Sequence, residues 1–304
     1  MDAEALAGVP VAACVGTLTA GGAVVPAAYN GAGKAAIMDI NTQQHKWRLF
    51  RIFMRPTVSE PIALTPFVLY QSTLLNAYAE RVIHGFTGKP LTLGGAAFSP
   101  EEVQAARRAV CEHAGLDYER LVLPRQTHTD LALLNDLPCA DEADAVILTQ
   151  PGLPAMVQVA DCVPVILYDP ERHVGAVVHS GWKGTAQSIT VKVARRLIEE
   201  HGARADRMVA VIGPSIGGCC YEVSQEVADA VGKTIPGQPV ELYQTQGQNG
   251  KPLVDLKWVN CLQLEHLGVE RIEIIDACTQ CLPETLWSYR RQESGRQVAF
   301  LQLL

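Results

Sequence analysis

The sequence predicts an α+β fold built around a mixed β-sheet, with one main domain over residues 66–304. Helical and strand-like segments are intermixed along this stretch, and no internal repeat is present. Two runs rich in Val and Ile flank the turn Asp169-Pro-Glu-Arg172, which indicates an antiparallel β-hairpin over residues 155–185. An intermixed order that contains an antiparallel pair favours a mixed sheet over a uniform array of βαβ units.

The individual elements follow from capping residues and apolar patterns. We expect helices at 74–80, at 99–115, from 180 to about 202, at 224–230 and at 255–267. We expect strands at 81–86, 120–124, 144–149, 208–212, 271–276 and 297–303. The helix at 99–115 has the clearest signal, since Ser99 and Glu102 form a capping box and Gly115 suits the C-terminal cap. Residues 233–252, rich in Gly, Gln and Pro, are expected to form a flexible loop or lid.

The hairpin turn sets a register that matters for chemistry. If Asp169 and Arg172 close the turn, Cys162 lies directly opposite His179 on the neighbouring strand, with Cβ atoms roughly 5 Å apart. Pro164 cannot donate a hydrogen bond, so a bulge or an edge position is expected there and could shift the register by one.

Residues 1–65 differ in composition from the rest of the chain. Residues 3–37 are mostly Ala, Gly and Val with few charges, whereas 46–55 contain one lysine and three arginines. We interpret this segment as an N-terminal extension with little order, outside the main fold. An organelle-targeting role stays open, although Asp2 and Glu4 fit a transit peptide badly.

Composition limits the class of partner and the compartment. The net charge of −7 and the pI near 5.6 argue against a nucleic-acid-binding protein. No apolar run is long enough to span a membrane, and the N-terminus lacks a secretory signal pattern. Nine cysteines without the spacing of a disulfide scaffold indicate reduced thiols in a cytoplasmic protein. The sequence does not indicate an oligomeric state.

Three residues are candidates for a metal site that is also the catalytic centre. Cys162 and His179 face each other in the predicted hairpin, and His128 lies in the polar loop after a predicted strand. Two imidazoles and one thiolate are a typical Zn²⁺ ligand set with one position left for water. Zinc would lower the pKa of that water to about 7. Without a metal, the Cys–His pair also suits a nucleophile and its base, and a His₂Cys copper site is formally allowed.

Two segments are candidates for binding phosphate. Gly181 and Lys183 lie in a glycine-containing turn at a predicted helix start, where backbone N–H groups and the lysine charge attract anions. A tight strand-to-helix turn explains the same glycines equally well. A second group is Arg290 with Arg291 and Arg296, although a solvated basic face is the simpler interpretation.

The remaining cysteines and titratable residues carry weaker signals. Cys278-Thr-Gln-Cys281 would need a second cysteine pair to bind structural zinc, and the adjacent Cys219 and Cys220 do not easily share one ion. We therefore interpret both pairs as reduced core or loop cysteines. His84 is a reserve ligand, and Glu222 is a weak acid–base candidate.

A set of short motifs resembles a known family. They occur in the family's order: His84-Gly-Phe86, Arg125-Gln-Thr-His128, Ala143-Asp-Ala145, Ala160-Asp-Cys-Val-Pro-Val165, His179-Ser-Gly-Trp-Lys-Gly184, Gly213-Pro-Ser-Ile-Gly217, Cys219-Cys-Tyr-Glu-Val223, Cys278-Thr279 and Ser288-Tyr-Arg-Arg291. Residues 66–304 thus resemble the laccase-domain (YfiH-like) family, also called polyphenol oxidases and described as purine nucleoside phosphorylases. Lys183 and Lys89 stand where the family pattern has Arg, and Thr129 where it has Gly.

The resemblance implies a fold and an activity. It implies mixed β-sheets sandwiched between helices, and zinc bound by His128, Cys162 and His179. It also implies that purine nucleosides and phosphate are the substrates: adenosine, inosine, guanosine and methylthioadenosine undergo phosphorolysis, and adenosine is also deaminated. The alternatives are a copper-dependent polyphenol oxidase, a metal-free Cys/His hydrolase, and a non-enzymatic module with structural zinc.

Overall fold

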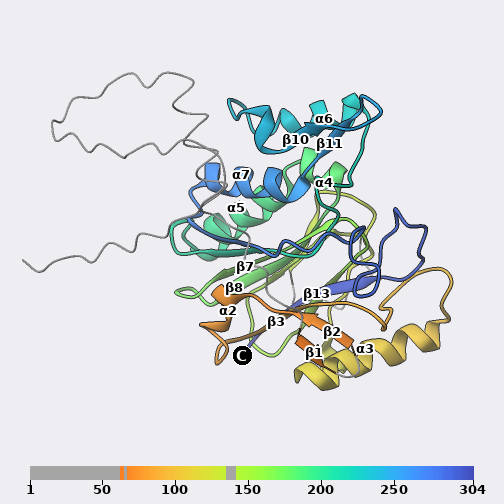
Figure 1. The fold of residues 1–304 in the computed structure, drawn as a ribbon. Coiled ribbons are helices and arrows are strands. Elements are labelled where there is room, and N and C mark those ends of the chain that lie inside the picture. The colour runs from red at the N-terminus through yellow and green to blue at the C-terminus, as the bar shows by residue number, and fades with distance from the viewer. Residues whose placement is uncertain (1–61, 65–66, 135–141) are drawn as a thin grey trace, which may run out of the picture. The chain divides into compact units, whose positions relative to one another are not determined.

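Two β-sheets pack face to face, with helices on the outer side of each (Figure 1). A computed structural model describes residues 62–64, 67–134 and 142–304 of the chain. The expected α+β class with mixed sheets between helices is confirmed. The predicted extension over residues 1–65 lies almost wholly outside the described residues.

The first sheet has six strands in the order β12-β9-β7-β8-β5-β4. Its strands are β4 (Ala132–Leu134), β5 (Ala145–Leu148), β7 (Val163–Asp169), β8 (Val174–Ser180), β9 (Val209–Ile212) and β12 (Arg271–Ile274). The sheet is mixed, because β12 and β4 run parallel to their neighbours while the four central strands are antiparallel to one another.

The second sheet has five strands in the order β1-β2-β3-β13-β6 and is antiparallel throughout. Its strands are β1 (Ile62–Leu64), β2 (Phe67–Tyr70), β3 (Val82–Thr87), β6 (Ala155–Val159) and β13 (Gln297–Leu303).

The helices are α2 (Thr73–Asn76), α3 (Pro100–Ala114), α4 (Trp182–Ala186), α5 (Ile189–His201), α6 (Gln225–Gly232) and α7 (Leu256–Leu267), with 3₁₀ turns at Tyr118–Arg120 and Val240–Leu242. The short helix α2 packs Leu75 into the core between the two sheets. Helices α5 and α7 cover the six-stranded sheet, and α3 covers the five-stranded sheet. No helix among the described residues is long and apolar enough to cross a membrane.

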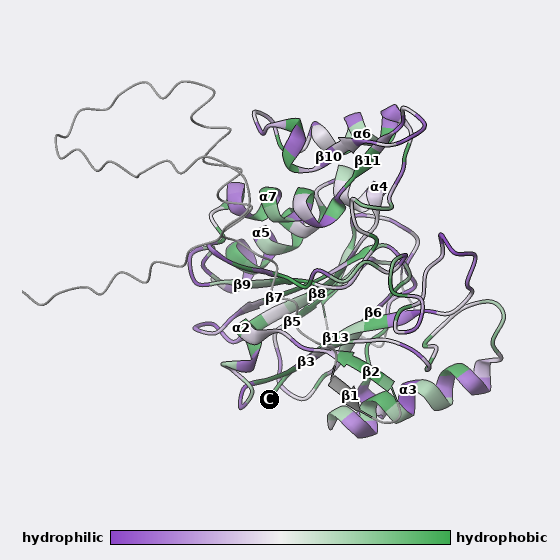
Figure 2. Ribbon diagram, viewed as in Figure 1, coloured by the Kyte–Doolittle hydropathy of each residue, from purple (hydrophilic) through white to green (hydrophobic). Residues whose placement is uncertain are grey.

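Successive side chains of β7 point to opposite faces of the sheet, so this strand contributes to two hydrophobic cores. Val165 and Leu167 pack under the helices, whereas Ile166 and Tyr168 pack between the two sheets. All seven residues of β7 are buried, which accounts for its continuous apolar run. Figure 2 shows the same contrast, with largely apolar strands inside and a banded α3 outside.

Local capping signals are confirmed where they were strong. Ser99 accepts from the N–H of Glu102, the Glu102 carboxylate accepts from the N–H of Ser99, and Gly115 ends α3 with φ 71°. The predicted strands at 81–86, 144–149, 208–212, 271–276 and 297–303 are also present.

The predicted register of the hairpin is wrong by two residues. Pro164, not Cys162, lies opposite His179. The Asp169 carbonyl accepts from the N–H of His173 at 2.9 Å, and His173 adopts φ 55°, so the loop contains four residues rather than two. Because a shift of two keeps every side chain on its original face, Cys162 still lies on the same side as His179.

The predicted first strand of the hairpin is in fact two strands in different sheets. Asp161, with φ 82°, breaks the run, so β6 belongs to the five-stranded sheet and β7 to the six-stranded sheet. Cys162 therefore lies in a bend between sheets. The prediction of a bulge or an edge position at Pro164 is wrong, since β7 is an interior strand of its sheet. The carbonyl of Pro164 accepts a hydrogen bond from Gly213 N at 2.8 Å.

Three further expectations need correction. Residues 120–124 form only an isolated bridge through Val122 rather than a strand. The helix expected from 180 to 202 is broken at Ser188, which has φ 56°, into α4 and α5. The segment 233–252 carries a short hairpin of β10 (Gln244–Gln246) and the start of β11 (Pro252–Val254).

Candidate metal centre and substrate pocket

Three separate segments bring His128, Cys162 and His179 together. His128 lies in the loop before β4, Cys162 in the bend between the sheets, and His179 near the end of β8. Their donor atoms all lie within 4.8 Å of one another, with Cys162 Sγ 3.9 Å from Nε2 of His128. His128 has φ 62°, a left-handed conformation that is uncommon for residues other than glycine. Together with Asp161, it places strained backbone on both sides of the cluster.

Asp144 positions both histidines. Its Oδ1 lies 2.6 Å from Nδ1 of His179 and accepts from the backbone N–H of His128 at 3.2 Å. Its Oδ2 accepts from the backbone N–H and the hydroxyl of Thr129 at 2.5 and 2.8 Å. With Nδ1–H of His179 donated to Asp144, Nε2 is the ring nitrogen left to bind a metal ion beside Cys162.

Cys162, His179 and Asp144 shift each other's pKa values. Burial by itself raises the pKa of Cys162, but the charge of His179 and hydrogen bonds from both histidines outweigh burial and lower it to about 6. Burial opposes the charged form of His179, yet the Cys162 thiolate and Asp144 raise its pKa to about 9. Asp144 is fully buried, and its hydrogen bonds hold its pKa at about 2. These shifts favour a Cys162 thiolate beside a protonated His179 at neutral pH, and a metal ion bound here would take the place of the proton on Nε2 of His179.

The arrangement fits a metal ion with an open position. It offers two imidazole nitrogens and one thiolate, which is one ligand fewer than a closed structural zinc site. The buried carboxylate behind His179 is the usual second partner of a metal-ligating imidazole. No role was predicted for Asp144, although an acidic residue at the start of the apolar strand 144–149 is the sequence feature that could have indicated one.

Gly181 gives the ligands room. A Cβ at this position would lie 3.0 Å from Cys162 Sγ and 3.1 Å from Cδ2 of His128. The glycine is needed for close approach of the chain to the cluster. Helix α4, which it precedes, has only five residues, so the expected contribution of a helix dipole to anion binding is small.

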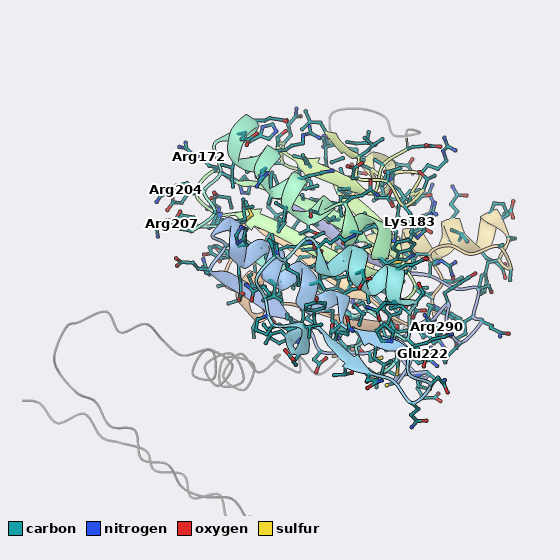
Figure 3. The ribbon with its side chains drawn as sticks, turned by 90° about the horizontal axis from the view of Figure 1, so that it is seen from above. Arg172, Lys183, Arg204, Arg207, Glu222 and Arg290 are labelled. Atoms are coloured by element: carbon teal, nitrogen blue, oxygen red, sulfur yellow. The ribbon has the colours of Figure 1, made fainter. Side chains whose placement is uncertain are left out.

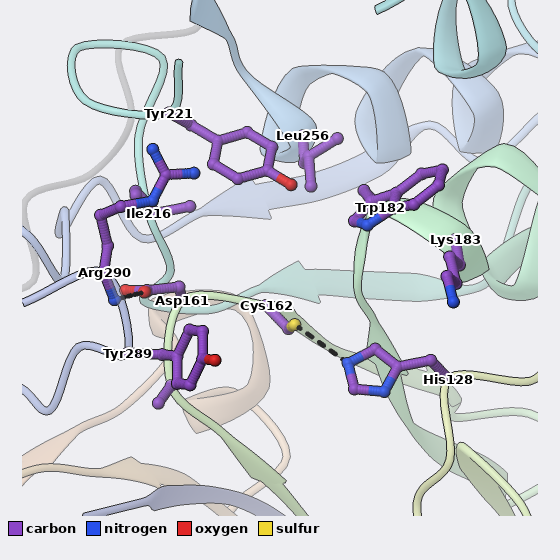
Figure 4. A pocket seen from close by; sticks show the side chains of 11 residues that line it. His128, Asp161, Cys162, Trp182, Lys183, Ile216, Tyr221, Leu256, Tyr289 and Arg290 are labelled. Atoms are coloured by element: carbon purple, nitrogen blue, oxygen red, sulfur yellow. Dashed lines mark hydrogen bonds between the residues drawn. The ribbon is translucent and has the colours of Figure 1, made fainter. Parts of the chain in front are cut away.

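A pocket of about 370 Å³ opens on one side of the cluster (Figure 4). His128, Asp161 and Cys162 line it together with aromatic, aliphatic and basic side chains. The other main lining residues are Trp182, Lys183, Ile216, Tyr221, Leu256, Tyr289 and Arg290. Burial raises the pKa of Tyr221 to about 12, so its hydroxyl stays protonated and can donate a hydrogen bond.

A second pocket of about 660 Å³ meets the first at the cluster. His128, Cys162 and Tyr289 line both, whereas His179 lines only the second. The second pocket adds polar and basic residues, namely Arg125, Gln126, Gln158 and Arg296. Both volumes lie in the range of pockets that bind small molecules.

Two of the predicted anion-binding residues line the smaller pocket. Lys183 and Arg290 line the smaller pocket from opposite walls, as Figure 4 shows. Arg290 lies over the Tyr221 ring at 5.2 Å and donates to the Glu222 carbonyl. In Figure 3 Lys183 and Arg290 lie on one side of the molecule, far from the surface arginines 172, 204 and 207.

Several weaker candidates have structural partners instead. The Arg291 guanidinium donates to the carbonyls of Thr279 and Leu286 and pairs with Glu293, so it is neither a solvated arginine nor an anion grip. Lys89 pairs with Glu293 at 2.9 Å and lies over the Trp287 ring, outside both pockets.

Two reserve residues also lie away from the cluster. His84 accepts a hydrogen bond from the N–H of Ser72, and burial lowers its pKa to about 4. The Glu222 carboxylate accepts from Asn249 and does not line either pocket.

The two cysteine pairs expected to be reduced core or loop cysteines are free thiols, and the fold brings the two pairs together. The sulfurs of Cys219, Cys220, Cys278 and Cys281 all lie within 4.8 Å of one another. The segments that carry them follow β9 and β12, which are parallel neighbours in the sheet. Their proximity depends on a strand pairing that the sequence does not reveal.

Fold and site together define a class of protein: a two-sheet α+β domain with a His₂Cys cluster at the meeting point of two pockets. The sequence profile described as "Multi-copper polyphenol oxidoreductase laccase" matches residues 95–304. The chain belongs to this laccase-domain family.

Curated relatives and solved structures agree with this assignment. The chain is 35% identical over 205 residues to "Purine nucleoside phosphorylase Rv2149c" of Mycobacterium tuberculosis, covering 66% of this chain and 79% of the relative. It is 32% identical to "Adenosine deaminase RL5" from an unknown prokaryotic organism, covering 63% and 78%. The structure of YlmD from Geobacillus stearothermophilus superposes with a TM-score of 0.73 at 25% identity, covering 82% of this chain and 99% of that one. The Bacillus licheniformis YfiH structure gives a TM-score of 0.71 at 28% identity, covering 80% and 98%.

Proposed function

We propose that this chain is a zinc-dependent purine nucleoside phosphorylase that also deaminates adenosine. Its nucleoside substrates would be adenosine, inosine, guanosine and methylthioadenosine. The observation that carries the proposal is the convergence of His128, Cys162 and His179 at the point where two substrate-sized pockets meet. Relatives named as purine nucleoside phosphorylases and as an adenosine deaminase support both reactions.

Zinc is the metal that best suits these donors. Two neutral imidazoles and a thiolate, with a position left open, are typical of catalytic zinc. When bound, the ion supplies a Lewis acid and lowers the pKa of a water molecule to about 7. Asp144 holds the His179 ring in the orientation that points Nε2 at the cluster.

The smaller pocket suits a purine nucleoside beside an anion. Trp182, Tyr221 and Leu256 offer flat and apolar surface for a purine ring. Lys183 and Arg290 lie on opposite walls and supply positive charge for phosphate. Lys183 offers a point charge rather than the two-pronged contact of an arginine.

Phosphorolysis requires correct positions more than covalent chemistry by the protein. A phosphate oxygen forms a bond to the sugar C1′, the bond from C1′ to the purine nitrogen breaks, and the departing base takes up a proton. Lys183 and Arg290 would hold the phosphate in line with C1′. In deamination, water adds to purine C6 and ammonia leaves, so the purine must present C6 to the cluster instead.

One observation favours a second candidate, a metal-free Cys/His hydrolase. Asp144, His179 and Cys162 form a chain in which the carboxylate orients the imidazole and the imidazole faces a thiolate. This reading leaves no role for His128, whose Nε2 lies 3.9 Å from the same sulfur. Chelators would leave the activity of a metal-free hydrolase unchanged.

The decisive experiment combines metal analysis with product analysis. Bound metals are measured in the purified full-length protein, and inosine and adenosine are incubated with it, with and without phosphate. Phosphate-dependent release of free base that disappears in His179→Ala supports the proposal. Unchanged turnover in His179→Ala contradicts the site, and a stoichiometric copper content with a blue absorption band supports a polyphenol oxidase instead.

A further inference from the structure

A second group of ligating side chains lies outside the His₂Cys site. We call it the four-cysteine cluster, and its members are Cys219, Cys220, Cys278 and Cys281. Cys219 and Cys220 lie in the loop after β9, and Cys278 and Cys281 in the loop after β12. The two loops join through the backbone, since Ser215 N donates to the Ala277 carbonyl at 3.2 Å and Thr279 N donates to the Ser215 carbonyl at 3.1 Å.

The distances between sulfurs match a single tetrahedral ion. With zinc–sulfur bonds of about 2.3 Å, the sulfurs of a tetrahedral site lie about 3.8 Å apart. Cys281 Sγ lies 3.3 Å from Cys220 Sγ and 3.6 Å from Cys219 Sγ. All four sulfurs lie within 4.8 Å of one another, so shifts of about 1 Å or less bring each of them within reach of one ion.

The cluster also has the surroundings of a thiolate site. The N–H of Gly217 donates to Cys278 Sγ at 3.3 Å, as backbone donors do around metal-bound sulfur. A Cβ at Gly217 would lie 3.2 Å from Cys219 Sγ and 3.4 Å from the Cys278 Cβ, so glycine allows the loop to wrap closely around the sulfurs.

Disulfide formation explains this arrangement less well. A disulfide brings two sulfurs to about 2.05 Å and satisfies only that pair. Here Cys281 is about equally close to two partners, and all four thiols converge. Four sulfurs around one centre are what a metal ion requires.

We propose that the four-cysteine cluster binds a structural zinc ion, separate from the His₂Cys site. The ion is closed off by four protein ligands, so it has no position for water or substrate. It links the loops that follow two neighbouring parallel strands.

The zinc would thereby hold one wall of the substrate pocket. Tyr221 directly follows Cys220 and lines the pocket. Between Cys278 and Cys281, the Thr279 hydroxyl donates to the Asp161 carboxylate at 2.5 Å, and the other oxygen of Asp161 accepts from Arg290 N at 2.6 Å. Asp161 directly precedes Cys162. It therefore links the loop of the four-cysteine cluster to Cys162 of the His₂Cys cluster and to Arg290 of the smaller pocket.

The test counts zinc ions in full-length protein purified under reducing conditions. We expect Cys278→Ser/Cys281→Ser to lower zinc from about two ions per chain to about one. His179→Ala should lose the other ion, and the two changes together should lose both. Cys111→Ser, a change at a buried cysteine in α3 outside both clusters, should retain both. Equal zinc content in the double serine variant and the wild type would overturn the proposal, as would iron in place of zinc.

A measurement on the wild-type chain covers the case in which the serine variant does not fold. Cys219 and Cys281 are exposed, so as free thiols they would be alkylated within the first minutes of labelling. Bound to zinc, all four should resist alkylation until a strong chelator is added, and chelation should also lower the unfolding temperature. Rapid alkylation of Cys219 and Cys281 in untreated protein, or a disulfide among the four in its peptide map, would contradict the site.

Discussion

The two ligand clusters of this chain differ in what surrounds them. The His₂Cys cluster has three donors and lies where two pockets meet. The four-cysteine cluster has four donors, and its sulfurs line neither of those pockets. Its partners are instead the backbones of the two loops that carry it.

This contrast separates chemistry from architecture within one molecule. A site with a missing ligand and a cavity can bind and activate a substrate, whereas a site with a full ligand set can only hold chain segments together. The buried Asp144 behind His179 strengthens the comparison, since the open cluster alone has a carboxylate that orients a ligand. Changes at the open cluster should therefore affect activity first, and changes at the closed cluster should affect stability first.

The largest expected effect is the loss of a ligand from the open cluster. His128→Ala removes one of three donors, and we expect kcat/KM for inosine phosphorolysis to fall roughly 1,000-fold, which is about 4 kcal/mol of transition-state stabilisation. The unfolding temperature should change little. His266→Ala, a change at an exposed histidine in the last turn of α7, is the matched control. Wild-type kinetics in His128→Ala would leave the open cluster without a catalytic role.

A smaller effect is expected behind the ligands. Asp144→Asn keeps the size of the side chain but offers His179 an amide in place of a carboxylate, so the tautomer that points Nε2 at the metal is favoured less. We expect metal affinity to fall about 10- to 100-fold, measured by competition with a chelator. Asp130→Asn, in the same loop as His128 but paired with Lys192, should bind metal as the wild type does. Equal affinities in the two variants would show that Asp144 has a structural role alone.

Sequence patterns predicted the open cluster far better than the closed one. His179 and Cys162 were placed on one face by a register that proved wrong by two residues, and an even error preserves the face. The four-residue loop with His173 at φ 55° was not predicted, because Pro170 favours a turn with two central residues. The break at Asp161 was equally hidden, since it separates two apolar strands that read as one run.

The closed cluster could not be predicted from local patterns. Cys219 and Cys281 are separated by 62 positions, and they meet only because β9 and β12 are parallel neighbours. By contrast, the limits of α3 follow from Ser99, Glu102 and Gly115 alone, because a capping box and a C-terminal glycine act within a few residues. Local signals thus predict where elements begin and end, and long-range pairing decides which loops share a site.

Glu273 allows stability to be changed without touching either cluster. It lies on β12, and its carboxylate accepts hydrogen bonds from the N–H groups of Thr73 and Leu74 and from the hydroxyls of Ser72 and Thr73. Glu273→Gln should lower the free energy of unfolding by about 2 kcal/mol at neutral pH, because charge-assisted hydrogen bonds are lost. Metal content and turnover should be unchanged.

The pH dependence of this effect has a definite sign. Burial opposes ionisation of Glu273, but the hydrogen bonds outweigh it and hold its pKa below the ordinary value of 4.5. The unfolded chain therefore binds the proton more readily, so the wild-type advantage is present above about pH 4.5 and shrinks as the pH falls further. Urea unfolding of both proteins between pH 3 and 7 measures this, and a constant difference across that range would contradict the assignment.

The smallest effect is expected at the edge of the open pocket. Lys183 is exposed and lines the smaller pocket as a point charge, so its contribution to phosphate binding is limited by solvent screening. We expect Lys183→Ala to raise the KM for phosphate about 10-fold, while adenosine deamination, which uses no phosphate, keeps its rate. Lys183→Arg should restore or improve phosphate affinity, since a guanidinium binds phosphate through two parallel hydrogen bonds. Lys192→Ala controls for the general loss of positive charge, because Lys192 lies on α5 and pairs with Asp130. An equal rise in KM in Lys183→Ala and Lys192→Ala would place phosphate elsewhere, with the Arg125 and Arg296 side of the larger pocket as the next site to change.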